Sequence, residues 1–265
     1  MNVSAGEGIF GGLGQHMSIK NTIRRFTRAL GFDIHRYQPV TPDELRLIKM
    51  LAAHGVNLVF DIGANTGQFG GQIRKAGYKG RIVSFEALTS AHQQLLAARN
   101  NDPLWEVAPQ AAVGEEDGEI EIHLAGNSVS SSVLNMLDTH KSAAPDSAYV
   151  SSEKVPLRRL DTLAMNYIHP GDALFLKIDT QGYEDRVLGG APVIMAKAIG
   201  VQLELSLVPL YNEQKLYEEM KARLETMGFE LWSVTPEFVD PASGRLLQLN
   251  ATFFRPAKAR QARFE

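Results

Sequence analysis

Three acidic residues stand where short apolar segments of the sequence end. They are Asp61 after 58–60, Glu86 after 82–85 and Asp179 after 173–178. Each apolar segment has the length and composition of a buried strand, and the carboxyl ends of parallel strands meet at one edge of a sheet. We therefore expect the three carboxylates to gather at one rim, where such groups bind hydroxyls and amines or take up protons.

A glycine turn follows the first of these strands. Gly63 and Gly67 leave little side-chain bulk after Asp61, so that a ligand could lie against the backbone. A dinucleotide site requires glycines spaced G-x-G-x-x-G, but Asn65 and Gln68 occupy the second and third positions counted from Gly63. The cradle for a pyrophosphate is therefore missing, and Asp61 would repel a phosphate.

The same acids suit S-adenosylmethionine. Asp61 could bind its ammonium group, and Glu86 lies about 20 positions beyond the turn, where a ribose diol is held in nucleotide sites. This cofactor carries no phosphate, so the missing cradle is no obstacle to it. The alternative is a turn that only connects a strand tightly to a helix and binds nothing.

The elements that must position these residues follow from the hydrophobic periodicity. Strands alternate with helices, which predicts an α/β fold with a mostly parallel sheet. The predicted helices are 42–54, 68–76, 90–100, 184–188 and 213–227. The predicted strands are 58–60, 81–85, 105–113, 119–124, 155–157, 173–179, 199–207, 229–234 and 247–255. Strict alternation in 119–124 indicates a half-exposed strand that runs antiparallel to its neighbour.

Composition limits the function classes. The chain has 265 residues, of which 44% are hydrophobic, and this fits one α/β domain with a terminal extension. A net charge of -3 gives no electrostatic footprint for nucleic acid. The lack of cysteine excludes thiol nucleophiles and cysteine-bound zinc. Because the seven histidines are scattered, a metal would have to be an oxygen-bound cation such as Mg²⁺.

We divide the chain into a disordered amino-terminal segment (1–17), a helical extension (18–55), a cofactor-binding domain (56–256) and a tail (257–265). The extension carries an apolar stripe flanked by basic residues between Lys20 and Arg28. Such a helix could dock on the domain or make weak peripheral contact with an anionic membrane, and we favour docking. No run is long enough to cross a membrane and no signal peptide is recognisable. We therefore expect a cytoplasmic location, or a peripheral one at the inner membrane surface.

Several short motifs occur in a fixed order along the chain. They are Asp61–Phe69, Phe85-Glu86, Ser131-Ser132, Leu160-Asp161, Leu176–Glu184, Val187–Ala191 and Glu204. The series resembles FkbM-type methyltransferases over roughly residues 56–255, above all in 176–184. The resemblance implies a class I, Rossmann-like methyltransferase fold, in which helices cover both faces of a seven-stranded, mostly parallel sheet closed by an antiparallel hairpin. One departure is Ala87, where the family usually has proline; it should change the rigidity of the turn and not the cofactor.

The resemblance also implies O-methylation of a sugar, glycolipid or related natural product, and hence a small-molecule or saccharide acceptor. The residues expected at the cofactor are Asp61, Gly63, Ala64, Asn65, Gly67, Glu86 and Ala87. Two other functions stay open. A nicotinamide-dependent oxidoreductase would need the missing glycines, and an inactive cofactor-binding partner subunit would not need three acids at one rim.

Methylation of a hydroxyl requires a general base or a metal, because a hydroxyl is a poor nucleophile until it loses its proton. Asp179 is the first candidate for the base, with Glu184, Glu204 and His140 as alternatives. Asp179 and Glu204 could instead hold Mg²⁺. Glu184 could equally be a favourable charge at a helix start.

The polar segment 126–152 shows no clear periodicity, and structureless segments of this length inside a domain are often functional. We expect residues 127–148 to cover the crevice as a lid, with Ser131 and Ser132 in contact with acceptor hydroxyls. Gln181, in the motif after Asp179, is a further candidate for an acceptor contact. A solvated loop is the alternative for the segment.

Overall fold

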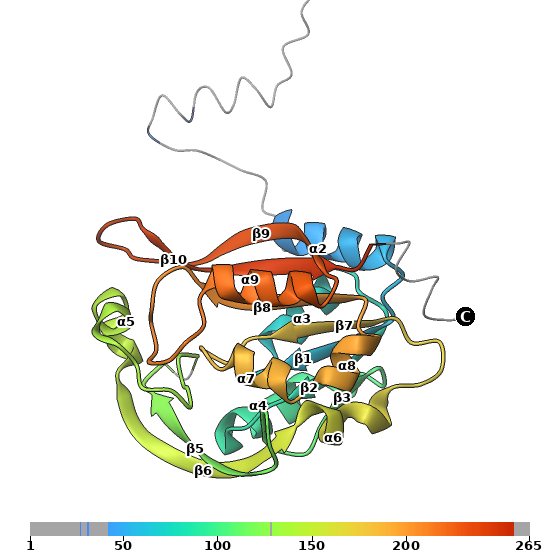
Figure 1. Ribbon diagram of the computed structural model, residues 1–265, viewed down its shortest axis with the longest axis horizontal. Coiled ribbons are helices and arrows are strands. Elements are labelled where there is room, and N and C mark those ends of the chain that lie inside the picture. The colour runs from blue at the N-terminus through green and yellow to red at the C-terminus, as the bar shows by residue number, and fades with distance from the viewer. Residues whose placement is uncertain (1–26, 28–30, 32–41, 128, 257–265) are drawn as a thin grey trace, which may run out of the picture. The chain divides into compact units, whose positions relative to one another are not determined.

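Seven strands form the central sheet of the computed structural model (Figure 1). Their order across the sheet is β3 (Trp105–Val107), β2 (Arg81–Phe85), β1 (Leu58–Ile62), β7 (Leu174–Ile178), β8 (Gly200–Ser206), β10 (Leu246–Phe254) and β9 (Glu230–Val239). Neighbouring strands run parallel except that β10 is antiparallel to both β8 and β9. The predicted mostly parallel sheet closed by an antiparallel hairpin is confirmed.

Helices cover both faces of this sheet because its central strands are apolar on both sides. Every residue of β1, β7 and β8 is buried. One apolar cluster joins the sheet to α2 (Pro42–Ala53), α3 (Gln68–Lys75) and α4 (Thr89–Ala98). The other joins it to α6 (Leu160–Ala164), α7 (Glu184–Gly189), α8 (Pro192–Lys197) and α9 (Tyr217–Thr226). A short 3-10 helix, η2 (Met165–Tyr167), follows α6.

The structure describes residues 27, 31, 42–127 and 129–256. The predicted disordered segment, most of the basic helix with Lys20 and Arg28, and the predicted tail lie outside the described residues. The described residues from 42 to 256 belong to one compact unit. Among the described residues, no helix has the length and apolar character needed to span a membrane.

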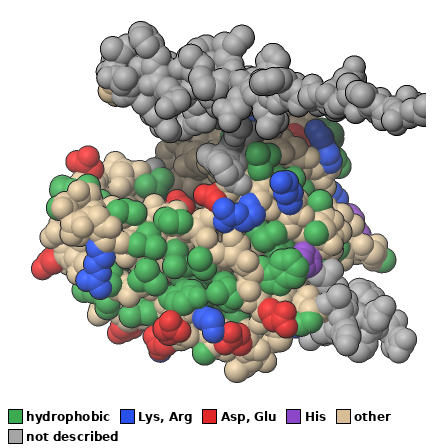
Figure 2. Space-filling view, turned by 90° about the horizontal axis from the view of Figure 1, so that it is seen from above, with side chains coloured by type: hydrophobic (Ala, Val, Ile, Leu, Met, Phe, Trp, Pro, Cys, Tyr) green, Lys and Arg blue, Asp and Glu red, His purple; other side chains and the backbone are tan. Residues whose placement is uncertain are grey.

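The helix α2 belongs to the unit that contains the sheet, although we assigned its residues to the extension. Leu47 and Leu51 pack with the apolar cluster of α3 and α4. At the end of this helix, the His54 ring stacks on Phe254 of β10 with 3.8 Å between ring centroids, and it meets Trp232 of β9 edge-on at 4.4 Å. The carboxyl end of α2 is therefore fixed to the outer hairpin of the sheet. The Trp232 side chain is half exposed. Figure 2 shows hydrophobic side chains on the molecular face seen from above.

The prediction of one strand over 105–113 is wrong, because this segment contains two strands that belong to two different sheets. β3 ends at Val107, and Ala112–Gly114 forms β4 in a second, three-stranded sheet. Pro109 lies between them and has no N–H to continue the ladder, so the chain leaves the central sheet there.

The second sheet has the order β4-β6-β5, where β5 is Gly118–Ala125 and β6 is Tyr149–Arg159. β5 is antiparallel to β6, as the alternation in 119–124 predicts. The stretch expected to be irregular contains α5 (Asp138–Ala143), the 3-10 helix η1 (Pro145–Ser147) and the start of β6. The inner face of this sheet packs against Leu88 and Ala91 at the start of α4, so it stands beside the carboxyl end of β2.

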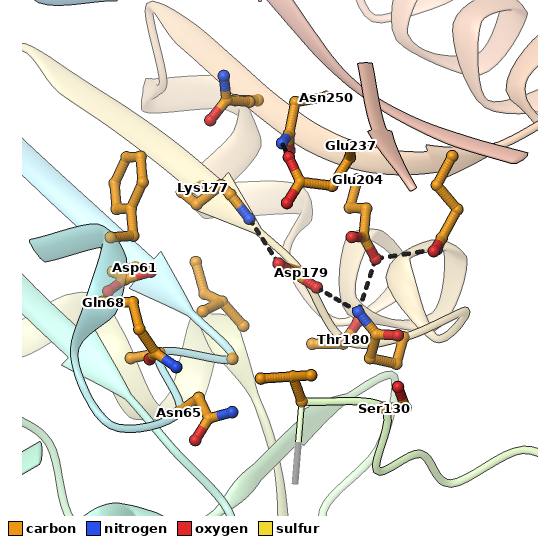
Figure 3. Close-up of a pocket in the computed structure, with 18 of the residues that line it drawn as sticks. Asp61, Asn65, Gln68, Ser130, Lys177, Asp179, Thr180, Glu204, Glu237 and Asn250 are labelled. Carbon is orange, nitrogen blue, oxygen red and sulfur yellow. Dashed lines mark hydrogen bonds and ion pairs between the residues drawn. The ribbon is translucent and has the colours of Figure 1, made fainter. Parts of the chain in front are cut away.

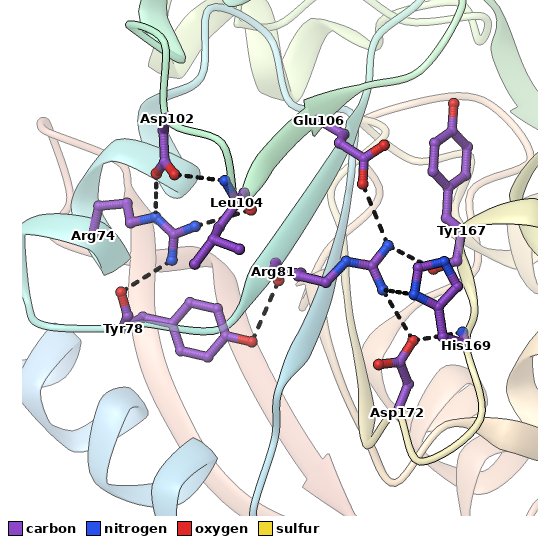
Figure 4. A network of polar contacts seen from close by, with 9 residues as sticks. All are labelled: Arg74, Tyr78, Arg81, Asp102, Leu104, Glu106, Tyr167, His169 and Asp172. Atoms are coloured by element: carbon purple, nitrogen blue, oxygen red, sulfur yellow. Dashed lines mark hydrogen bonds and ion pairs between the residues drawn. The ribbon is translucent and has the colours of Figure 1, made fainter.

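Two arginines tie together the amino ends of the strands, on the edge opposite the three acids (Figure 4). Arg81 binds Asp172 (Nη1 to Oδ2, 3.1 Å) and the Tyr167 carbonyl (2.9 Å). Arg74 binds Asp102 (Nε to Oδ2, 2.7 Å) and loop carbonyls before β2 and β3. These partly buried contacts fix the loops that lead into β2, β3 and β7. They leave the opposite edge of the sheet free to form a site.

Candidate functional site

A cavity of about 740 Å³ lies at the carboxyl ends of β1, β2 and β7 (Figure 3). Its volume is in the range of small-molecule sites. One half is lined by the turn after β1, residues 86–88 after β2 and residues 111–113. The other half is lined by residues 177–181, by polar side chains of β8, β9 and β10, and by parts of 127–144. Asp61, Glu86 and Asp179 all line it, as do Gly63, Ala64, Asn65 and Ala87.

The turn after β1 packs directly on the end of β7. Gly63 has φ 76°, and a Cβ there would lie 1.9 Å from the carbonyl oxygen of Asp179. Only glycine allows this contact. The backbone N–H of Asp179 also donates to the Ile62 carbonyl at 3.0 Å. The glycine turn and the Asp179 segment are therefore held together as one wall of the cavity, whereas Gly67 (φ 89°) lies behind it at the start of α3.

Glu86 joins the turns after β1 and β2. Its carboxylate accepts hydrogen bonds from the backbone N–H groups of Asn65 (2.7 Å) and Leu88 (2.8 Å). Burial raises the pKa of Glu86, although these N–H groups oppose the rise. The side-chain oxygen Oδ1 of Asn65 is buried and has no hydrogen-bond partner among the residues that the structure describes. Since Asn65 lines the cavity, this atom is available to a hydrogen-bond donor of a ligand.

Asp61 is almost fully buried, at 1% exposure, beside Lys177 on the neighbouring strand. Its Oδ2 accepts a hydrogen bond from the Ser84 hydroxyl at 3.2 Å. Burial raises the pKa of Asp61 to about 7, even though Lys177 and Ser84 oppose the rise. This carboxylate is therefore only partly ionised at neutral pH until a cation approaches it.

A polar network occupies the other half of the cavity (Figure 3). Lys177 Nζ lies 2.9 Å from Asp179 Oδ2, and Gln181 Nε2 donates to Asp179 Oδ1 at 2.9 Å. The same amide nitrogen donates to Glu204 Oε2 at 2.6 Å, and Gln248 donates to that oxygen at 3.0 Å. Lys177 and Glu204 are buried, whereas 31% of the Asp179 side chain stays exposed. Asp179 is thus the member of this network most open to a ligand.

The two carboxylates of the network differ in their tendency to ionise. Burial would raise the pKa of Asp179, but the Lys177 ammonium and the Gln181 amide outweigh burial and hold that pKa below its usual value. Burial and the neighbouring Asp179 charge raise the pKa of Glu204 well above its usual value. On acidification Glu204 is therefore the first of the two to take up a proton, whereas Asp179 keeps its charge to a lower pH.

The Mg²⁺ site that we considered at Asp179 and Glu204 does not fit these contacts. An ammonium occupies one oxygen of Asp179, and amide N–H groups point at the other and at Glu204. A divalent cation would lie against these positive hydrogens. Among the described residues, no group of three His, Cys, Asp or Glu side chains is arranged to hold a metal ion.

Glu184 does not join the other candidates in the cavity. It is buried at the start of α7, and its Oε1 accepts hydrogen bonds from the backbone N–H groups of Thr180 (2.8 Å) and Gly182 (3.2 Å). Burial raises the pKa of Glu184 to about 7. These contacts shape the turn that carries Gln181, so the carboxylate faces the backbone and not the cavity.

His140 on α5 lines the cavity, although only 2% of it is exposed. Its ring contacts the rings of Tyr211 (5.1 Å between centroids) and Phe238 (5.3 Å). Burial lowers the pKa of His140 to about 4, which keeps the imidazole neutral at neutral pH. Its Nδ1 is buried and has no partner in the part of the chain that the structure describes. A ligand group could therefore bind this nitrogen.

Ser131 and Ser132 also line the cavity, but their hydroxyls are already engaged. Ser131 Oγ accepts a hydrogen bond from the Ala125 N–H at 3.0 Å. Ser132 Oγ donates to the Gln181 carbonyl at 2.6 Å and accepts from the Leu134 N–H at 3.0 Å. Both serines fix the loop that passes over this half of the cavity.

Sequence reasoning missed several polar residues of the cavity wall. Gln248, Asn250 and Thr252 of β10 line it together, and so does Lys177. Their alternation with apolar residues along β10 is the period of a strand face, and this pattern could have identified them. A lysine inside the otherwise apolar strand 174–178 was a second available signal, because a buried charge needs a partner.

Comparison with known proteins decides the family. Residues 61–231 match the methyltransferase FkbM domain. The chain belongs to the FkbM methyltransferase family. It is an S-adenosylmethionine-dependent methyltransferase, as the motifs predict, and not a nicotinamide-dependent oxidoreductase. No curated protein sequence matches the chain significantly.

Solved methyltransferase structures are similar to this chain in fold at low sequence identity. A putative O-methyltransferase from Klebsiella pneumoniae has 9% identity and a TM-score of 0.47, with 92% of this chain and 93% of that chain covered. Magnesium protoporphyrin IX methyltransferase from Synechocystis PCC 6803, solved with bound S-adenosylmethionine, has 11% identity and a TM-score of 0.43, with 92% and 100% covered.

Proposed function

We propose that this FkbM methyltransferase transfers a methyl group to a hydroxyl of a sugar, glycolipid or related polyhydroxylated natural product. The observation that supports this acceptor is the chemistry of the cavity half around Asp179. Neutral amide and hydroxyl side chains line it, namely Gln202, Gln248, Asn250, Thr252, Thr235 and Ser130. Asn250 Oδ1 and His140 Nδ1 are buried there without a partner among the described residues. Such a surface suits a ligand that offers several hydroxyls.

The other half of the cavity fits the cofactor. We assign the ribose hydroxyls to Glu86, the ammonium group to Asp61 and a further donor to the free Oδ1 of Asn65. Apolar residues 87–88 and 111–113 provide a slot for the base. When bound, S-adenosylmethionine supplies a methyl group on a positively charged sulfur, which is a good leaving group.

Asp179 is the proposed general base. It is ionised, partly exposed and held by Lys177 and Gln181, so it can accept a proton from an acceptor hydroxyl placed beside it. The rigid wall formed by the Gly63 turn and the end of β7 sets the position of this carboxylate relative to the cofactor half. Positioning of this kind can lower the activation free energy by about 7–11 kcal/mol. His140 is the second candidate, as a neutral imidazole that can accept a hydrogen bond.

Cofactor affinity is expected to depend on pH through Asp61. Binding an ammonium requires the ionised carboxylate, whereas in the free protein burial raises its pKa to about 7. Below that pH the affinity should fall, by up to tenfold for each pH unit. Calorimetry with S-adenosylhomocysteine from about pH 5.5 to 8 measures this. Asp61→Asn should bind more weakly and lose the slope; an unchanged slope in this variant would remove Asp61 from the ammonium site.

The acceptor class is tested by methyl transfer from radiolabelled S-adenosylmethionine. Neutral hexose glycosides and glycolipids should accept the label, and mass spectrometry should locate it on oxygen. The matching uronates should react at least about tenfold more slowly, since Asp179 and Glu237 line the acceptor half, and Lys177 and Arg46, the cations that line the cavity among the described residues, are both already paired with carboxylates. Label found only on amine, thiol or carboxylate acceptors would contradict the proposal.

A further inference from the structure

The Gln181 side chain makes contacts with both ends of its amide. Its Nε2 donates one hydrogen to Asp179 and the other to Glu204. Its Oε1 accepts a hydrogen bond from the Tyr211 hydroxyl at 2.8 Å. Tyr211 is fully buried behind this residue, and burial raises the pKa of its hydroxyl, so that the group stays protonated and able to donate. The amide therefore bridges two carboxylates on one side and a tyrosine on the other.

The backbone supports this arrangement at some cost. Gln181 has φ 52°, in the left-handed region that residues with a side chain rarely adopt because the Cβ is crowded there. Its carbonyl accepts a hydrogen bond from Ser132, and Gly182 follows with φ 96°. A Cβ on Gly182 would lie 3.1 Å from the Tyr211 ring. The turn is thus packed onto Tyr211 and holds Gln181 in a strained position, as is common at functional sites.

The opposite orientation of the amide would serve the network badly. It would direct Oε1 at Asp179 and Glu204, and two carboxylates can satisfy that oxygen only by taking up a proton. Tyr211 could still donate, because the Ser130 carbonyl lies 3.3 Å from its hydroxyl. The two carboxylates therefore favour the observed orientation, and the hydrogen bond from Tyr211 to Oε1 at 2.8 Å adds to that preference by satisfying the amide oxygen.

We propose that Tyr211 is a positioning residue that acts through Gln181. Its hydroxyl fixes the amide so that both N–H groups face the carboxylates, which holds Asp179 in place as an ionised proton acceptor. The inference deepens the proposed function, since it rests on Asp179 as the base. Its test does not depend on any acceptor.

The experiment is a ¹³C NMR titration of the carboxyl groups, with Asp179 and Glu204 assigned from Asp179→Asn and Glu204→Gln. The wild type and the variants share the other ionisable groups around this pair. These groups are Lys177 and Asp61 in the sheet, Glu184 on α7 and Glu237 on β9. Tyr211→Phe should raise the apparent pKa of the pair by about one pH unit, because the freed amide no longer stabilises the charge fully. Gln181→Met should raise it similarly. The double variant should add nothing to the single changes.

Tyr149→Phe is the matched control. Its hydroxyl donates to the Leu134 carbonyl at 2.6 Å in the same apolar cluster and also interacts with the Ser132 hydroxyl, but among the described residues no direct hydrogen bond joins it to Gln181. This variant should leave the titration unchanged. An unchanged pKa in Tyr211→Phe, or additive effects in the double variant, would overturn the proposal. If Tyr211→Phe does not fold, the wild-type protein provides the test. Both side-chain amide protons of Gln181 should then exchange slowly with solvent, and fast exchange would overturn the proposal.

Discussion

Replacing Asp179 by Asn is expected to lower the turnover number by about 10²–10⁴, which is the usual contribution of a positioned general base. Asparagine keeps the shape of the side chain but cannot take up the proton of an acceptor hydroxyl. Its amide would also face the Lys177 ammonium, which lies 2.9 Å from Asp179 Oδ2. Cofactor affinity should change little, because Asp61 and Glu86 lie in the other half of the cavity.

The measurement is steady-state turnover with an acceptor from the methyl-transfer assay, combined with calorimetry of S-adenosylhomocysteine binding. Asp185→Asn is the control: this aspartate is paired with Arg223 and lies outside the cavity, so its loss should leave turnover near the wild-type value. Wild-type turnover in Asp179→Asn would assign the base elsewhere, and His140→Gln would then be the next variant. A loss of affinity as large as the loss of turnover would show that the variant distorts the turn at Gly63.

The fold could be predicted largely because its signals are local. Buried parallel strands such as 58–62 and 174–178 are apolar runs interrupted by a single charged residue each, Asp61 and Lys177, and the glycine turn after Asp61 marks where a strand gives way to a helix. The error at 105–113 arose because two short strands lie only four residues apart, with Pro109 and Gln110 as the interruption between them. Apolar character alone does not show that β3 and β4 belong to different sheets.

The site was harder to predict because it depends on contacts between distant segments. The strand-end acids could be placed at one edge from topology alone, and Asp61, Glu86 and Asp179 do line one cavity. Nothing local shows that Glu184 faces backbone N–H groups, or that Tyr211 meets Gln181 from 30 positions away. The same holds for the Ser132 hydroxyl, which is engaged by Gln181 and Leu134. Motifs locate such residues in the chain but not the direction in which their side chains point.

Lys177→Met is expected to be the most destabilising single change at the site. The lysine is buried, at 5% exposure, and its ammonium interacts with Asp179, Glu204 and Asp61. Burial lowers its pKa, but these carboxylates outweigh burial and raise it, so Lys177 stays charged. Methionine fills the space of the lysine side chain but leaves the three acids without the neighbouring positive charge. Removing one member of a buried ion pair typically costs about 3–5 kcal/mol of unfolding free energy.

The pH dependence of this loss follows from the three acids. Burial raises the pKa of Asp61 to about 7 and that of Glu204 well above its usual value, so both become neutral on acidification and need no cation. The part of the loss due to Asp61 should therefore be present above about pH 7 and shrink as the pH falls through 7, and the part due to Glu204 should shrink as the pH falls through the raised pKa of that group. The pKa of Asp179 is below its usual value, so its part should persist until the pH falls below about 4. Lys177 itself contributes below its unfolded pKa of about 10.4, and that contribution is lost only as the pH rises through its higher folded value.

Urea unfolding at about pH 8 and pH 5.5 tests both parts. We expect the difference between wild type and Lys177→Met to be about 3–5 kcal/mol at the higher pH and clearly smaller at the lower. The matched control is Lys221→Met, which removes an exposed ion pair with Glu225 on α9 and should cost less than about 1 kcal/mol at either pH. If Lys177→Met loses as little unfolding free energy as the control variant, the acids of the cavity are protonated together in the free enzyme. A large loss that does not change with pH would mean that Lys177 acts through packing against Phe69, whose ring centroid lies 5.8 Å from its Nζ, and not through its charge.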